Sequence, residues 1–186
     1  MRIAVIASST GGPLIIEEIF SDFPALFFTI IIIQHLPASF IETFRKHLSL
    51  VTRMNVLIGS EGHQISEKEI IIAPAGSHLT LEKNRIIHLI DGEKQHGVRP
   101  AADYTMVSLK HRVDDRLVGV VLTGMGQDGA AGIAHINDLN GFTIAQDPHT
   151  APIRSMPQSA IETGKVTEIL SPKGIREALI RFGSGL

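Results

Sequence analysis

The chain has 186 residues, of which 44% are hydrophobic and 19% charged, a composition that suits one domain with a sizeable core and excludes a disordered chain. Seventeen Lys and Arg against nineteen Asp and Glu give a formal net charge of −2, which argues against nucleic acid or an anionic membrane as a partner. Cysteine is absent, which excludes disulfides, thiolate metal ligands and a thiol nucleophile.

One apolar stretch has the charge pattern of a membrane span. Residues 23–41 contain no Asp, Glu, Lys or Arg, but prolines, a glutamine and a histidine interrupt them. Their continuous apolar part, residues 25–33, is about half as long as a transmembrane helix must be. The N-terminus also lacks the apolar core and the small-residue cleavage site of a signal peptide. We therefore expect no membrane insertion and a cytoplasmic location.

Short apolar runs rich in valine and isoleucine alternate with longer helix-like segments. Runs without polar alternation are typical of strands that are covered on both faces. In chain order, the predicted strands are residues 2–7, 26–33, 55–59, 69–74, 117–124, 142–146 and 166–170. The predicted helices are residues 13–20, 38–51, 101–113, 128–139 and 172–182. The alternation predicts an α/β fold with a doubly wound, mostly parallel sheet flanked by helices.

The middle of the chain departs from this alternation. Residues 78–91 contain two alternating apolar runs around Glu82, Lys83 and Asn84, a pattern that predicts a small β-hairpin insertion. Residues 91–100 are polar and predict a loop before the next helix. The sequence contains neither an internal repeat nor an interdomain linker, so we expect one domain over residues 1–186.

Polar side chains follow three of the predicted strands. Ser8 and Ser9 come after the first strand, His35 after the second, and Asp128 after the strand at residues 117–124. Ligands of open parallel sheets bind beyond the carboxyl ends of the strands. A serine becomes a good nucleophile when a histidine takes its proton and a carboxylate orients that histidine. The three strand ends therefore offer the groups of a serine hydrolase, and the residues alone do not decide between the two serines.

The same residues also have ordinary structural interpretations. Residues 9–12 could form a turn or a helix cap, His35 could hydrogen-bond a loop, and Asp128 could cap the helix that follows it. The glycines could cradle a phosphate or a developing oxyanion through backbone N–H groups, although neither the dinucleotide nor the P-loop pattern is present. Since no spacing typical of metal ligands is found, we expect neither a metal nor a cofactor.

Seven motifs occur in the order and at the spacing of one known family. They are IASSTGGP, IIQHLPASF, APAGSHLTL, RPAAD, GVVLTGMGQDGAAGI, TIAQDP and SMPQSAI. Over residues 3–170, they resemble the catalytic domain of the CheB family of chemotaxis protein-glutamate methylesterases. The resemblance implies a serine hydrolase of doubly wound α/β fold that demethylates glutamate methyl esters on the cytoplasmic helices of chemoreceptors and releases methanol. Many members of this family also deamidate receptor glutamines.

The resemblance also implies a role for each residue that matches a family motif. It implies that Ser9 is the nucleophile, that His35 is the general base and then the acid, and that Asp128 orients the imidazole. Thr10 and Met125 correspond to positions near the family's active site that assist the oxyanion. Arg99, in the motif RP, is a candidate contact for the substrate.

The sequence departs from the family pattern at a few positions. Ala7, Ala101 and Ser155 replace a glycine, a serine and a glycine of the family motifs, and these changes bear on substrate preference rather than on the triad. Family members usually carry an N-terminal phosphorylation-receiver domain, whereas this sequence begins at the catalytic strand. We therefore expect one methylesterase-type domain, either a fragment or a stand-alone protein, with any regulation supplied by a separate receiver protein.

Two alternative functions remain open from the sequence. The first is a serine hydrolase of the same fold that acts on an ester or amide of another protein. The second is a non-catalytic module that keeps the fold and binds an anion at residues 9–13. The presence of all three residues Ser9, His35 and Asp128 favours an enzyme over the binding module.

Overall fold

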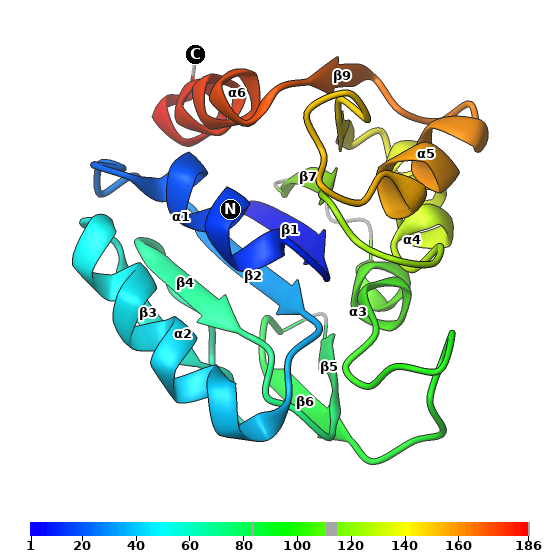
Figure 1. Cartoon of the computed structure of the whole chain (residues 1–186). Coiled ribbons are helices and arrows are strands. Elements are labelled where there is room, and N and C mark those ends of the chain that lie inside the picture. Colours follow the sequence, from blue (N-terminus) through cyan, green and yellow to red (C-terminus); the bar gives the residue numbers. More distant parts are fainter. Residues whose placement is uncertain (83, 111–114, 186) are drawn as a thin grey trace.

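The computed structural model describes residues 1–82, 84–110 and 115–185. Within them, seven parallel strands form one sheet in the order β3-β4-β2-β1-β7-β8-β9, and β5 and β6 form a separate antiparallel hairpin (Figure 1). The strands are β1 (Arg2–Ser8), β2 (Thr29–Gln34), β3 (Asn55–Ile58), β4 (Glu69–Ile72), β5 (His78–Leu81), β6 (Ile87–Ile90), β7 (Arg116–Val121), β8 (Phe142–Gln146) and β9 (Glu168–Leu170). This topology confirms the doubly wound α/β fold and the hairpin.

In the described part of the chain, six helices cover the two faces of the sheet, three on each face (Figure 1). One face is covered by α1 (Gly12–Phe20), α2 (Ala38–Val51) and α6 (Pro172–Ser184). The other is covered by α3 (Ala102–Ser108), α4 (Ala130–Asp138) and α5 (Ser155–Glu162), together with the hairpin. Among the described residues, no helix combines the length and the apolar character that a membrane crossing requires.

The run of isoleucines in β2 serves both of these layers. Ile30 and Ile32 pack into the core beneath α1, α2 and α6, whereas Ile31 and Ile33 pack into the core beneath α3, α4 and α5. Successive side chains of a strand point to opposite faces, so a central strand with two covered faces must be apolar at every position. This requirement explains the charge-free stretch of sequence that resembled a membrane span.

Two helices differ from the sequence prediction. The helix expected at residues 101–113 ends at Ser108, because Leu109 turns to extended backbone with ψ 136° and is buried in the core. The Ser108 hydroxyl then accepts the Leu81 N–H of the hairpin at 3.1 Å. Residues 111–113 of that prediction lie outside the described residues. Helix α5 was not predicted from the sequence, and only Met156, Pro157 and Ala160 of this helix are buried.

The topology creates a switch point at the carboxyl ends of β1 and β7. These neighbouring strands are parallel, but β1 leads into α1 on one face and β7 leads into α4 on the other. Where the connections diverge, a crevice forms outside the strand ends, which is the usual ligand site of such sheets. The turns that follow β1, β2 and β7 all begin at this edge of the sheet.

Candidate active site

Ser9 lies in the turn between β1 and α1. Its N–H donates to the Thr123 carbonyl at 3.0 Å, and the residue is partly exposed, whereas Ser8 is fully buried. The helix α1 has Gly11 as its N-cap, with φ 80°, and receives no side-chain cap. Residues 9–12 therefore form a turn with Gly11 as the N-cap, and no side chain among them caps the helix. The turn places Ser9 at the crevice, and its side chain does not cap α1.

Gln34 ties the turn after β1 to the turn after β2. It pairs with Ser8 across the two strands, and the backbone N–H of His35 donates to the Ser8 carbonyl at 3.0 Å. The buried Gln34 side-chain amide donates from Nε2 to the Ser9 carbonyl at 2.9 Å and to the His35 carbonyl at 3.3 Å. One side chain thus spaces the two turns that carry the serine and the histidine. Gln34 stood at a strand end in the sequence, but nothing in the sequence indicated this role.

His35 and Asp128 are brought together although they are far apart in the sequence. His35 Nε2 lies 2.8 Å from Asp128 Oδ2, and the aspartate side chain is 2% exposed. Since an ionised carboxylate only accepts hydrogen bonds, Nε2 is assigned the proton, which leaves Nδ1 as the basic nitrogen. The Asp128 carboxylate also accepts the backbone N–H groups of Ala102 at 2.7 Å and Asp103 at 2.9 Å.

The interpretation of Asp128 as the cap of the helix that follows it is therefore wrong. The carboxylate accepts hydrogen bonds from the first turn of α3 instead, while α4 has Gly129 as its N-cap and no side-chain cap of its own from that residue. Burial raises the pKa of the Asp128 carboxyl, but the hydrogen bonds from His35, Asp103 and Ala102 outweigh burial and bring the pKa below its ordinary value. The site thus holds Asp128 ionised beside the imidazole.

The turn after β7 forms the other wall of the crevice. Thr123 Oγ1 donates to the Thr10 carbonyl at 3.0 Å, which joins this turn to the turn that carries Ser9. A Cβ on Gly124 would lie 2.7 Å from the Ser9 Cβ, so a glycine is needed where the two turns meet. Met125 follows with 72% of its surface exposed, and Thr10 is also exposed. No hydrogen bond among the described residues uses the N–H of Thr10 or Met125.

Arg99 lies near His35 but is engaged within its own segment. A pocket of about 280 Å³ lies beside His35, between residues 35–37 and the segment that contains Lys94 and residues 97–100. Arg99 lines this pocket, donates from Nη1 to the Gly92 carbonyl at 2.6 Å and pairs with the exposed Asp91. The guanidinium therefore shapes the pocket wall, and its contact with a substrate stays a prediction.

The serine, the histidine and the aspartate do not form a closed hydrogen-bonded chain in this structure. The contact between His35 and Asp128 is present, whereas the Ser9 hydroxyl has no hydrogen bond to any described residue. Catalytic hydrogen bonds are often long in free enzymes and tighten when substrate binds. Ser9 and His35 directly follow the paired ends of the neighbouring strands β1 and β2.

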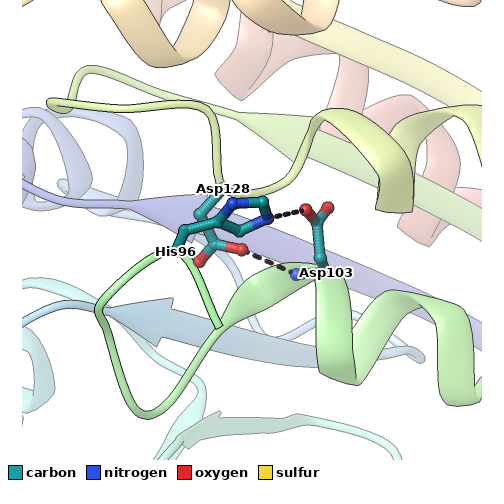
Figure 2. Close-up of side chains that lie close together, drawn as sticks. All are labelled: His96, Asp103 and Asp128. Carbon is teal, nitrogen blue, oxygen red and sulfur yellow. Dashed lines mark hydrogen bonds and ion pairs between the residues drawn. The ribbon is translucent and has the colours of Figure 1, made fainter. Parts of the chain in front are cut away.

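Asp103 and His96 extend the polar site beyond the predicted residues (Figure 2). His96 Nε2 lies 2.8 Å from Asp103 Oδ2, and possible ligand atoms of His96, Asp103 and Asp128 all lie within 4.8 Å of one another. A divalent cation would need free carboxylate oxygens here. Each of the four oxygens already accepts at least one N–H, from His35, His96 or the backbone. The cluster therefore fits a hydrogen-bond network better than a metal site.

The fold and the site define a class: a doubly wound α/β protein with a serine, a histidine and an aspartate gathered at its switch point. A family model described as CheB methylesterase matches residues 4–179, and the chain belongs to that family. This confirms the resemblance that the motifs indicated.

The relatives and a solved structure agree with this assignment. A protein-glutamate methylesterase/protein-glutamine glutaminase of Pyrococcus abyssi is 43% identical over 185 residues, which cover 97% of this chain and 50% of the relative. A protein of the same name from Symbiobacterium thermophilum is 35% identical, with 97% and 50% covered. The crystal structure of the Thermotoga maritima CheB methylesterase catalytic domain matches with a TM-score of 0.91 and 32% identity, covering 96% of this chain and 97% of that chain. The chain spans about half the length of the curated relatives it matches.

Proposed function

We propose that this chain is a protein-glutamate methylesterase that hydrolyses glutamate methyl esters on the cytoplasmic helices of chemoreceptors and acts in the cytoplasm. Three features support the proposal: membership of the CheB methylesterase family, the names of the relatives, and the arrangement of Ser9, His35 and Asp128. The observation that carries it is the buried contact of 2.8 Å between His35 and Asp128, at the end of the strand beside the one that leads to Ser9.

The proposed reaction is an acyl transfer in two steps. Ser9 Oγ attacks the ester carbonyl while His35 Nδ1 takes the hydroxyl proton. The collapse of the tetrahedral intermediate breaks the bond to the methoxy oxygen, His35 returns the proton to that oxygen, and methanol leaves an acyl-serine. Water, deprotonated by His35, then releases the glutamate carboxyl and restores Ser9. A receptor glutamine would follow the same route and release ammonia.

The two imidazole nitrogens exchange roles relative to the serine protease template. In that template Nε2 faces the serine and Nδ1 faces the aspartate. Here Nε2 faces Asp128, so Nδ1 is the nitrogen that serves the serine. The ionised Asp128 stabilises the imidazolium that forms when His35 takes the proton, because its pKa lies below the ordinary value.

The oxyanion is the second group that the site must stabilise. The N–H groups of Thr10 and Met125 are proposed as its donors, because both residues border Ser9 or Gly124 and neither N–H is used by another described residue. Donors that are fixed before the reaction stabilise the developing charge without reorganisation. Lys94 and Arg99 line the neighbouring pocket, and because Arg99 already pairs with Asp91, Lys94 is the cation proposed to meet an acidic side chain of the receptor helix.

The two alternatives of the sequence analysis compete with this proposal. A hydrolase with another protein substrate would use the same triad, and an anion-binding module would not need the contact between His35 and Asp128. A separate receiver protein is proposed as the regulator. Each alternative gives a different result in one set of assays.

The decisive assay is methanol release from a methylated cytoplasmic receptor fragment. We expect the Ser9→Ala variant to lose nearly all activity, because it removes the nucleophile, and the Ser8→Ala control to keep most of it, because Ser8 is fully buried. An active Ser9→Ala variant would overturn the assignment of the nucleophile. If the wild type hydrolyses a small phenyl ester in a Ser9-dependent reaction but releases no methanol from the receptor fragment, a hydrolase with another protein substrate is favoured. The absence of both activities in the wild type would favour the binding module.

A further inference from the structure

Two histidine–aspartate pairs are joined into one network at the site, of which Figure 2 shows His96, Asp103 and Asp128. The first pair is His35 with Asp128, and the second is His96 with Asp103, each at 2.8 Å. The backbone N–H of Asp103 donates to Asp128 Oδ1 at 2.9 Å, so the two pairs are in direct contact. Asp103 is 1% exposed and the proposed mechanism does not use its carboxylate.

Each aspartate holds the backbone that carries the other. Asp128 accepts hydrogen bonds from the first turn of α3, which contains Asp103. Asp103 Oδ1 in turn accepts the N–H of Gly129 at 2.9 Å, the residue directly after Asp128, and the N–H of Gly132 at 2.7 Å. The position of the Asp128 carboxylate is therefore fixed from both sides. A shift of Asp103 would move both the donor to Asp128 and the loop that carries Asp128.

The reciprocal hydrogen bonds of Asp103 and Asp128 are called the lock below. His96 connects this lock to the wall of the pocket. It belongs to the polar segment of residues 91–100, part of which lines the pocket beside His35. With Nε2–H donated to Asp103, its Nδ1 accepts from the side-chain amide of Gln127, at 3.3 Å. Through His96, the segment is thereby attached both to Asp103 in the first turn of α3 and to Gln127, which precedes α4.

The two carboxyls differ in their affinity for protons. Burial raises the pKa of Asp103, and the negative charge of Asp128 adds to this effect, while hydrogen bonds from Gly132 and His96 oppose it. The pKa of Asp128 is lowered by its own donors, although burial opposes them. Among the described residues, His96 and Asp128 face Asp103, and His35 lies beyond Asp128. As the pH falls, Asp103 takes up a proton first and Asp128 keeps its charge for His35.

We propose that Asp103 is a positioning residue that holds Asp128 in place for catalysis, and that His96 secures Asp103 from the pocket wall. This inference rests on the proposed function only in so far as His35 is the catalytic base. With its attachment to His96, the lock consists of five contacts. Asp103 makes four of them, with residues 96, 128, 129 and 132, and Asp128 makes the fifth with residue 102.

The first test replaces Asp103 by asparagine. The variant keeps an oxygen for the Gly129 and Gly132 N–H groups, so the fold is retained, but it removes the charge beside Asp128 and the acceptor for His96. We expect kcat for methanol release to fall roughly 10- to 100-fold with KM nearly unchanged, because small misplacements of catalytic groups have effects of this size. The acid limb of the pH profile of kcat/KM should also move to lower pH, since a nearby negative charge is lost.

A second readout does not need turnover. In ¹⁵N-histidine-labelled protein, the proton that His35 Nε2 shares with Asp128 gives a low-field resonance, which we expect to shift or broaden in the Asp103→Asn variant. His96→Asn approaches the same network from the surface, and asparagine tolerates the left-handed backbone of this residue, with φ 53°. It should shift the resonance in the same direction by a smaller amount.

The matched control is His63→Gln. His63 pairs with Glu69 at 3.1 Å, and Glu69 begins β4 at the amino end of the sheet, opposite the site. This variant removes a similar pair and should leave kcat, the pH profile and the resonance unchanged. A loss of kcat in Asp103→Asn without change in the acid limb and the resonance would reduce Asp103 to a structural residue and overturn the proposal. A resonance that shifts in Asp103→Asn, although the wild type releases no methanol, would support the lock while the proposed function fails.

Discussion

Ser8 and Ser9 have opposite environments although they are neighbours in the chain. Ser8 Oγ is buried without a partner among the described residues, as is Gln34 Oε1, and both atoms face the position that a Cβ of Gly12 would occupy. Gly12 is therefore required for close contact between α1 and the ends of β1 and β2. Ser9, one residue further on, leaves the strand and reaches the crevice. The strand end thus separates a buried serine that packs against α1 from the partly exposed serine proposed as the nucleophile.

The sequence alone could not make this distinction. Side chains alternate along a strand, but where β1 ends, and hence which serine leaves the sheet, depends on the pairing of Ser8 with Gln34. The motif resemblance selected Ser9, and the structure supplies a physical reason for that choice. The role of Gln34 was out of reach of the sequence, because its two acceptors are backbone carbonyls of different turns.

Gln34 is expected to control activity more than its burial alone would suggest. Gln34→Met keeps an approximately similar volume but leaves the carbonyls of Ser9 and His35 without their donor. We expect a loss of stability of about 1–3 kcal/mol, the usual effect of unpaired buried groups, and a fall in kcat of at least about 10-fold, because the spacing of the two turns is no longer fixed. Urea unfolding and methanol release measure the two effects.

Thr29→Val is the control for this variant. Thr29 is also fully buried in β2, but at the amino end of the strand, where its hydroxyl donates to the Ser66 carbonyl at 2.6 Å. It should lose stability by a similar amount and keep its kcat. Equal losses of kcat in the two variants would show that Gln34 acts only through global stability.

At the scale of elements, the strands were easier to predict than the helices. All seven strands found in the described part of the sheet were expected. Burial on both faces makes the central strands continuous apolar runs, as in β2, whereas the edge strands β3 and β9 are only partly buried. The predictions for the short helices α3 and α5 were wrong for a different reason. The end of α3 is set by Leu109 entering the core and by the hairpin contact of Ser108, and α5 buries too few side chains to give a periodic pattern.

The packing of α5 against the turn after β7 also determines the position of Ser9. A Cβ on Gly124 would collide with Met156 Sδ of α5 and would lie 2.7 Å from the Ser9 Cβ. The methionine can move, but the serine backbone is held by Thr123 and Gln34. We expect Gly124→Ala to lower kcat roughly 100-fold, because Ser9 must shift within the crevice, and this is measurable by methanol release.

Gly119→Ala is the matched control on the same connection. Gly119 lies within β7, and a Cβ there would approach Ile136 Cδ1 at 2.9 Å and Ile133 Cδ1 at 3.0 Å. Overpacking at this position should destabilise the fold by about 1–3 kcal/mol with little change in kcat. A Gly124→Ala variant that is destabilised but fully active would contradict the role of this close approach.

At the scale of the whole molecule, the parallel sheet explains which parts of the site were predictable. Residues 9, 35 and 128 follow strands whose carboxyl ends share one edge, so a sequence that shows the strands also places these residues at that edge, and the order β2-β1-β7 makes their strands neighbours. Asp103 and His96 follow no strand of this sheet. Asp103 reaches the site because α3 packs against α4, with the Met106 side chain against Gly132, and His96 reaches it from the segment of residues 91–100 through its contact with Asp103. Packing of this kind leaves no signal in residue spacing. Asp103 lies in the motif RPAAD, but no role was predicted for it from the sequence.

The joined carboxyls should also give the stability of the molecule a recognisable pH dependence. The folded-state pKa of Asp128 lies below the ordinary aspartate value of 3.8, so its contribution to the free energy of unfolding is present above about pH 4 and is lost as the pH falls through the folded-state pKa. The pKa of Asp103 lies above 3.8, chiefly through burial, so its contribution is present below about pH 4 and is lost as the pH rises through the folded-state pKa.

Asparagine variants of the two residues should therefore respond to pH in opposite directions. Urea unfolding between pH 3 and pH 7 measures the difference in free energy of unfolding between the wild type and each variant. For Asp128→Asn, the advantage of the wild type should shrink as the pH falls, because the lost carboxylate no longer contributes in acid. For Asp103→Asn, the advantage of the wild type should grow as the pH falls, because the native carboxyl is then neutral and its burial is no longer penalised. Parallel slopes for the two variants would mean that the environments of the two carboxyls do not differ, and that the lock does not reserve the charge for Asp128.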